Sequence, residues 1–334
     1  MLSETWSSLR GDGERRARLF RGMARVMLSL AKVPFQRIGS LTIDHHGIAS
    51  HTNRPLTLEL ERLENAGIPT DIPKDLTYNT TDAYLLDLLR CQDNRLRYMT
   101  NSILNRADGI MQLSALTMAR TVLGQLYNRP LRSGPFVMQL TDLHASNIFV
   151  SEDWDITAII DLEWACTLPM EMLHPPYWLT AKAIDDINGE DLEEFECVHA
   201  EFVNSFEAKE RTFGHNNAPQ ALLMRSSWQS RIYWLFGAMT CLSGFYTLFA
   251  DHVRPRYIPY YDTNGSGESL EDTFDRLASA YWSVNTSDFI DQKLKGREEY
   301  RARLKDYFAI ELAKHANNSG KYQENSSGMY VERS

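Results

Sequence analysis

The stretch from Gly134 to Cys166 constrains the fold most, because it combines strand, loop and hairpin signals between long helical segments. Pro135 to Leu140 and Ile156 to Ile160 are apolar and rich in β-branched residues, whereas Ser151 to Asp155 is a polar, turn-forming cluster. This pattern predicts a strand, a loop and then a hairpin in which Ile148 to Val150 pairs antiparallel with the second apolar run.

Three polar residues take defined places in that pattern. Asp142 lies in the loop, Asn147 precedes the first hairpin strand, and Asp161 follows the second. Pairing across the turn brings Asn147 and Asp161 to the same open end, a residue or two out of register, and Asp142 can then face both. Amide and carboxylate oxygens are ligands for Mg²⁺ when substrate phosphates complete its shell, which leaves Asp142 to orient or deprotonate a hydroxyl. Singly, each residue is more typical of a turn cap or a strand end.

The motifs Asp142-Leu-His-Ala-Ser-Asn147 and Ile160-Asp161-Leu-Glu-Trp-Ala165 resemble the catalytic and metal-binding segments of the aminoglycoside phosphotransferase family, relatives of choline kinases and protein kinases. The resemblance spans roughly residues 13–315. It implies that Asp142 is the catalytic base, that Asn147 and Asp161 bind magnesium and the nucleotide phosphates, and that ATP donates its γ-phosphoryl group to the hydroxyl of a small molecule. The implied fold is mainly α with some β (α+β): the helical C-terminal lobe of a protein-kinase-like fold, with small β-hairpins at the catalytic and metal-binding loops.

Three positions depart from the family pattern. Leu140 stands where the family usually has His, Thr141 stands for Gly, and Glu163 stands for the Gly of its Asp-x-Gly segment. Losing the His removes a brace of the loop rather than a reacting group. Glu163 either adds a carboxylate near the metal or points away, since alternate residues of an extended chain share a face.

The composition indicates a globular protein and argues against a nucleic-acid partner. The apolar fraction of 43% and charged fraction of 24% are those of a soluble globular protein, and the net charge of −9 gives no basic footprint for nucleic acid. The four cysteines are widely spaced, which argues against a zinc site or a disulfide framework. Met1 to Arg21 carries charges throughout and lacks an apolar signal segment, so we expect a cytoplasmic protein.

Helical periodicity dominates the rest of the chain. Helices are expected over Gly13–Val33, Thr57–Ala66, Thr81–Thr100, Ile110–Tyr127, from an acidic run at Asp185–Glu196 to about Arg211, Leu270–Val284 and Phe289–His315, with a hairpin over Ile38–Ser50. Leu168 to Leu179 contains three prolines and is expected to be a stiff loop that walls the acceptor site. We expect one domain over residues 1–315 and a disordered polar tail over 316–334.

Ile232 to Ala250 is a 19-residue segment without a charge. It is long enough to be a membrane-span candidate, but its glycines and hydroxyl residues, in a chain otherwise globular in pattern, favour one buried central helix. A membrane-associated protein remains the less favoured alternative.

The sequence before Asp142 lacks a recognisable phosphate-covering loop and a lysine on a strand, which phosphotransferases of this type use to hold ATP. Gly11-x-Gly13 opens a helix without a preceding strand, and Lys32 stands at the end of a helical pattern. The chain therefore resembles a C-terminal lobe without its N-terminal lobe. The alternatives to an active kinase are a non-catalytic, pseudokinase-like binding or scaffold protein and a truncated gene product.

Overall fold

The computed structural model describes residues 1–214, 217–257 and 270–327. The protein is mainly helical with small antiparallel sheets, so the α+β class expected from the sequence is confirmed. Its α-helices are α1 (Leu2–Leu9), α2 (Gly13–Ala31), α3 (Leu58–Asn65), α4 (Thr81–Tyr98), α5 (Arg106–Leu126), α6 (Gly189–Thr212), α7 (Pro219–Gln229), α8 (Ile232–Thr240), α9 (Phe245–Leu248), α10 (Leu270–Ala280) and α11 (Thr286–Ser327).

The strands form three small antiparallel sheets among the described residues. The central one has the order β1 (Pro34–Phe35), β4 (Phe136–Leu140), β7 (Ala165–Pro169), and the hairpins are β2 (Ser40–Ile43) with β3 (Ala49–Asn53) and β5 (Ile148–Val150) with β6 (Ile156–Ile159). In the β2–β3 turn, Asp44 accepts hydrogen bonds from the backbone N–H groups of His46 and Ile48. The expected hairpin, with its turn at Asp44 to Gly47, is therefore confirmed.

Capping residues and prolines in the sequence predicted most helix starts to within a few residues. Thr57 caps α3 by accepting the N–H of Leu60, as expected of a helix starting there. α5 begins a turn earlier than expected, because the Asn105 side chain caps the N–H of Asp108. Leu168 to Leu179 is not a loop throughout, since its first residues complete β7 and Tyr177–Thr180 form a 3₁₀ turn.

The uncharged segment from Ile232 to Ala250 is buried but is not one helix. α8 ends at Thr240, and a break at Cys241 to Gly244 leads into α9 and a π-helical turn over Phe249–Val253. A Cβ atom on Gly244 would lie 2.6 Å from the Cβ of Asp185, so this close approach of two chain segments requires glycine where the helix breaks. In the described part of the chain, no helix is both long and apolar enough to cross a membrane.

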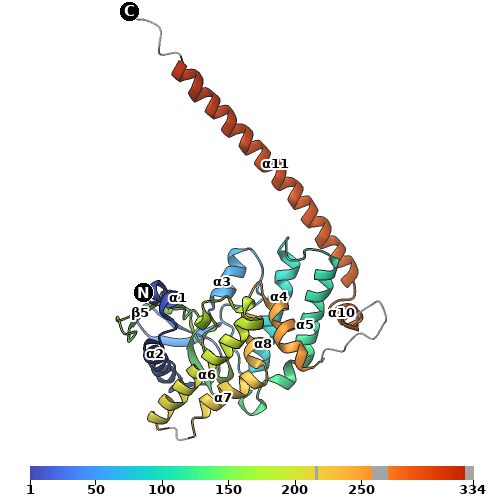
Figure 1. The fold of residues 1–334 in the computed structure, drawn as a ribbon. Coiled ribbons are helices and arrows are strands. Elements are labelled where there is room, and N and C mark those ends of the chain that lie inside the picture. Colours follow the sequence, from blue (N-terminus) through green and yellow to red (C-terminus); the bar gives the residue numbers. More distant parts are fainter. Residues whose placement is uncertain (215–216, 258–269, 328–334) are drawn as a thin grey trace, which may run out of the picture.

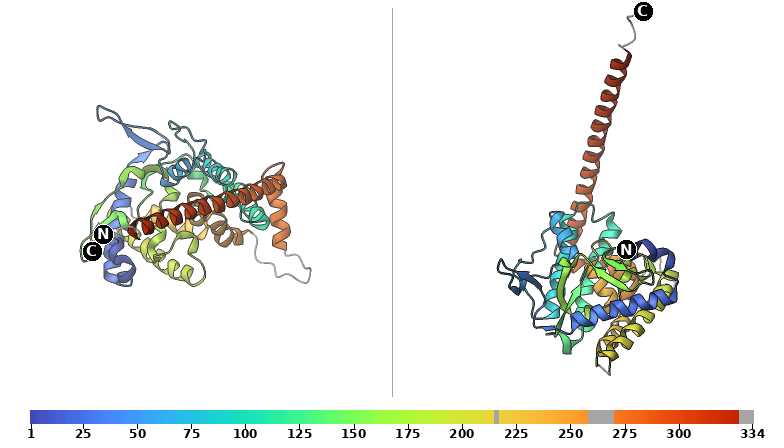
Figure 2. Two further views of the ribbon diagram at one scale, coloured as in Figure 1. Left: turned by 90° about the horizontal axis from the view of Figure 1, so that it is seen from above. Right: turned by 90° about the vertical axis from the view of Figure 1, so that its left-hand side faces the viewer.

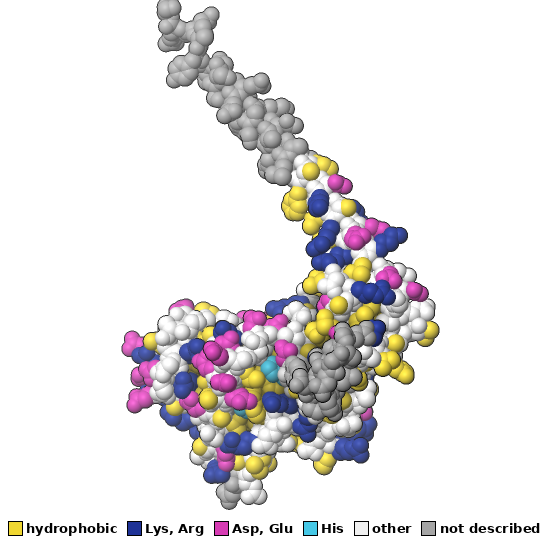
Figure 3. Space-filling model, turned by 45° about the vertical axis from the view of Figure 1, so that its right-hand side comes forward, with side chains coloured by type: hydrophobic (Ala, Val, Ile, Leu, Met, Phe, Trp, Pro, Cys, Tyr) yellow, Lys and Arg dark blue, Asp and Glu magenta, His cyan; other side chains and the backbone are white. Residues whose placement is uncertain are grey.

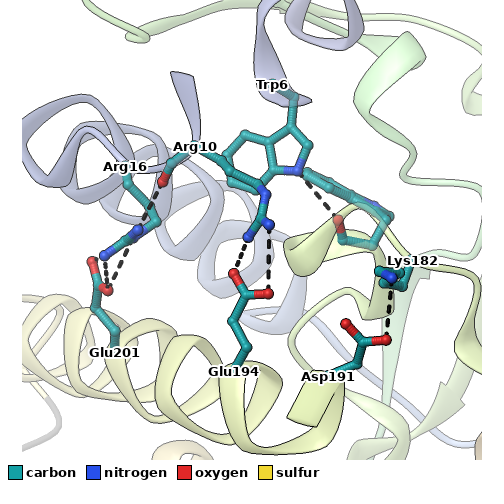
Figure 4. A network of polar contacts seen from close by, with 8 residues as sticks. Trp6, Arg10, Arg16, Lys182, Asp191, Glu194 and Glu201 are labelled. Atoms are coloured by element: carbon teal, nitrogen blue, oxygen red, sulfur yellow. Dashed lines mark hydrogen bonds and ion pairs between the residues drawn. The ribbon is translucent and has the colours of Figure 1, made fainter. Parts of the chain in front are cut away.

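The acidic start of α6 packs against the N-terminal helices (Figure 4). Glu194 pairs with Arg10, and both carboxylate oxygens of Glu201 accept from Arg16 at 2.6 to 3.0 Å. Asp191 pairs with Lys182 at 3.1 Å. Glu194, from the acidic run, thus ties the end of α1 to α6, and Glu201, further along the helix, ties α2 to it.

α11 projects away from the rest of the protein in Figure 1 and in the right-hand view of Figure 2. Lysine, arginine and acidic side chains mix along its described surface, with apolar side chains among them (Figure 3). The helix continues to Ser327, so the polar tail expected from residue 316 is helical in its first part, and 328–334 lie outside the described residues. The division into domains stays a prediction.

Candidate functional site

The hairpin predicted from the sequence forms in the expected register. Ile148 pairs with Ile159 and Phe149 with Ala158, and the N–H of Ile160 donates to the carbonyl of Asn147 at 3.0 Å. Asn147 therefore lies opposite the residue before Asp161, at the same open end of the hairpin.

Asn147 is also joined directly to Asp142. Its side-chain nitrogen Nδ2 donates to the backbone carbonyl of Asp142 at 2.9 Å and to the carboxylate oxygen Oδ2 at 3.2 Å. Asn147 is buried, with 7% of its surface exposed, so these bonds are shielded from water. Its own side-chain oxygen receives one long bond, from the Ser146 hydroxyl at 3.4 Å.

Two further contacts join the segment after Asp161 to the loop that holds Asp142. The hydroxyl of Thr141 donates to the carbonyl of Trp164 at 2.7 Å, and Leu140 pairs with Ala165 at the end of the central sheet. Asp161 lies between the hairpin and Trp164 in the chain. Its φ of 57° is a left-handed conformation that Asp tolerates better than most residues. Asp161 and Glu163 are both exposed to solvent.

Aromatic residues brace the same loop from α1. Trp178 donates from its ring nitrogen to the carbonyl of Leu143 at 2.7 Å, and Trp6 of α1 donates to the carbonyl of Trp178 at 3.2 Å. The rings of Trp6 and Trp178 meet edge to face, 5.3 Å between centroids. The N-terminal helix is thus connected to the Asp142 loop through one tryptophan.

His144 contacts the other oxygen of Asp142. Its Nε2 lies 3.2 Å from Oδ1, and its ring meets Tyr177 edge to face at 5.6 Å. Both carboxylate oxygens of Asp142 therefore have a partner, one in Asn147 and one in His144. The sequence motif contained His144 but gave it no role.

A cavity of about 390 Å³ lies beside the loop. Its wall includes Leu140, Leu143 and His144, which flank Asp142, and Tyr177 from the segment expected to wall the acceptor site. Leu140, which stands where the aminoglycoside phosphotransferase family usually has His, therefore contributes an apolar side chain to the cavity wall. The rest of the lining comes from the segment between Leu168 and Trp178, from α2, α3 and α8, and from the break that follows α8.

Glu59 is a site residue that the sequence did not reveal. It lies in the first turn of α3 and lines the cavity with Arg62, one turn further on. Burial raises the pKa of the Glu59 carboxyl, and the negative charge of nearby Asp142 raises it further, although the Arg62 guanidinium opposes both. Nothing in the local sequence distinguishes this glutamate from a solvated helix residue, because Asp142 approaches it only in the folded chain.

His174 is the second residue missed. Both of its ring nitrogens are buried without a hydrogen-bond partner in the described structure, and its ring packs edge to face on Tyr233 at 5.2 Å. Burial, with a contribution from His199, lowers the pKa of His174 to about 3. The imidazole is therefore neutral at physiological pH.

The oxygens of Asn147 and Asp161 suit a hard cation held jointly with phosphates. Among the described residues, no three histidine, cysteine, aspartate or glutamate side chains are gathered as a metal site. Mg²⁺ often takes only one or two protein carboxylates and completes its shell with phosphates and water. The side-chain oxygen of Asn147 and the exposed carboxylate of Asp161 fit that kind of site.

A lysine that could hold ATP phosphates is not found on a strand before Asp142. β1, β2 and β3, the strands described ahead of β4, carry no lysine. Lys32 is the residue after α2, where its ammonium lies over the Phe213 ring at 4.4 Å. The expectation that Lys32 is a helix-end residue is confirmed.

Comparison with models of protein families, with curated proteins and with solved structures finds no match to this chain.

Proposed function

We propose that this protein is a Mg²⁺-dependent phosphotransferase of the aminoglycoside phosphotransferase-like type, with a kinase-like helical lobe, that moves the γ-phosphoryl group of ATP to a small-molecule hydroxyl. The observation that carries the proposal is the double hydrogen bond from Asn147 to Asp142, next to the hairpin end that bears Asp161. This proximity supports the roles of base and metal ligands that the motif implies for these residues.

Each residue has a separate task in this proposal. Asp142 accepts the proton of the acceptor hydroxyl as its oxygen bonds to the γ-phosphorus and the bond to ADP breaks. Asn147 fixes the carboxylate through Nδ2, and its side-chain oxygen would be one ligand of Mg²⁺. Asp161 would supply the second protein ligand, and the ion, when bound, would neutralise charge on the phosphates.

The acceptor reaches Asp142 from the adjoining cavity. The cavity wall continues on both sides of Asp142 through Thr141 and Leu143, and Asp142 is near enough to influence the pKa values of Glu59 and Tyr177, two lining residues. This neighbourhood supports placing the attacking hydroxyl in the cavity and the phosphates on the hairpin side.

Transfer and binding can be separated with two carboxamide variants. With radiolabelled ATP and Mg²⁺, ATP turnover to water or an acceptor should fall at least about a hundredfold in Asp142→Asn, because the general base is lost, while Mg²⁺-ATP binding persists. Asp161→Asn should weaken both turnover and Mg²⁺-ATP binding. Turnover in Asp142→Asn equal to that of the natural chain would remove Asp142 from the mechanism.

A non-catalytic binding protein is the second candidate, and one contact favours it. Both carboxylate oxygens of Asp142 are already engaged, by Asn147 and His144. A carboxylate held on both sides stabilises a loop well without reacting. This candidate predicts ligand binding in the cavity and no ATP turnover in the natural chain.

A further inference from the structure

The cavity beside Asp142 is mainly apolar and close to charge-balanced. Of the described residues that line it, Glu59 and Arg62 carry charges of opposite sign, and the others are apolar, aromatic or polar without a fixed charge. Leu143, Leu168 and Phe236 are among the apolar ones. Such a wall offers little to a polycation, whose desolvation would need several carboxylates in compensation.

His174 adds a polar group to this lining that lacks a partner. A buried hydrogen-bonding group without a partner lowers the stability of the folded protein. Its ring faces Tyr233 and Phe236, which also line the cavity. His174 therefore lies in the cavity wall with no partner for either ring nitrogen among the described residues.

We propose that the cavity binds an uncharged, largely apolar alcohol, and that the imidazole of His174 hydrogen-bonds a polar group of that ligand. A neutral imidazole has one donor and one acceptor nitrogen, and a hydroxyl can serve either. The apolar body of the ligand would bury against the leucines and aromatic rings. The volume of about 390 Å³ is in the range for small ligands and admits a two-ring alcohol.

The inference rests on the proposed function in one respect: the bound alcohol is the acceptor whose hydroxyl meets Asp142. Binding itself is independent of nucleotide. A failure of phosphoryl transfer therefore leaves the binding test interpretable, and a failure of binding leaves transfer to another kind of acceptor possible.

The test compares two probes that differ by one hydroxyl, 2-naphthol and naphthalene, titrated by fluorescence into the full chain without ATP or Mg²⁺. We expect 2-naphthol to bind about tenfold more tightly than naphthalene, as one hydrogen bond in a dry site allows. In His174→Phe this preference should vanish while naphthalene binds as before. His174→Leu gives a second, smaller replacement if phenylalanine does not fit.

His199→Phe is the matched control. His199 is also a buried histidine with an unpartnered ring nitrogen, but it does not line the cavity. It should keep the tenfold preference. Absence of binding by either probe, or an unchanged preference in both His174 variants, would overturn the proposal, as would displacement of 2-naphthol by millimolar spermidine.

Discussion

The side-chain nitrogen of Asn147 donates to both the backbone carbonyl and the carboxylate of Asp142, residues five apart in the loop between β4 and β5. One buried amide thus fixes the backbone of the loop and the orientation of its acid. The same residue accepts from Ile160 through its backbone, so it couples the loop to the hairpin end at Asp161. Asn147 therefore connects the Asp142 loop to the end of the hairpin through its own hydrogen bonds.

Replacing Asn147 by alanine should lower the free energy of unfolding by roughly 1–3 kcal/mol, because the carbonyl and the half-buried carboxylate of Asp142 lose their donor. Urea unfolding followed by circular dichroism measures the change. Asn65→Ala is the control, since Asn65 is exposed at the end of α3 and its loss should cost less than about 0.5 kcal/mol. Equal effects of the two substitutions would contradict the structural role of Asn147.

Replacing Trp6 by alanine should loosen the Asp142 loop as well as destabilise the protein. The substitution removes the ring against Trp178 and its bond to the Trp178 carbonyl, a large loss for a buried side chain, about 3–5 kcal/mol. Hydrogen exchange should quicken in residues 141–147. Trp282→Ala, which removes a tryptophan bonded to Asp93, should leave exchange in that loop unchanged; faster exchange in both variants would show general destabilisation instead.

Stability should fall as pH drops from 7 to 5, in part because of two buried histidines. Burial holds the pKa of His174 at about 3 and that of His199 at about 4, below the ordinary value of 6.5. The unfolded chain therefore binds protons that the folded chain does not, and each histidine loses about 2 kcal/mol of its contribution by pH 5. The double variant His174→Phe, His199→Phe should show a flatter pH dependence of unfolding over this range. A dependence as steep as that of the natural chain would contradict both burial arguments.

The sequence predicted the parts of the site that local patterns encode. The β5–β6 hairpin follows from two apolar runs around a polar turn, and its register places Asn147 near Asp161 without tertiary information. The break after α8 was missed because the approach of Asp185 to Gly244 at this point joins residues far apart in the chain, which local patterns do not reveal. Glu59 and His174 were missed for the same reason.

Asp161 can be replaced to test nucleotide binding without disturbing the fold. Asp161 is exposed and in a left-handed conformation, so its substitution by asparagine should leave folding nearly unchanged, within about 0.5 kcal/mol. A loss of binding in that variant would therefore report the metal site rather than the fold.

The most direct test is calorimetric titration of ATP into the full chain with and without Mg²⁺, beside Asp161→Asn of matched melting temperature. The proposed phosphotransferase should bind ATP only with Mg²⁺, and the variant should bind at least about tenfold more weakly, because one carboxylate ligand is lost. Mg²⁺-independent binding, equal binding by the two proteins, or no binding by a folded natural chain would contradict the proposed metal and nucleotide site.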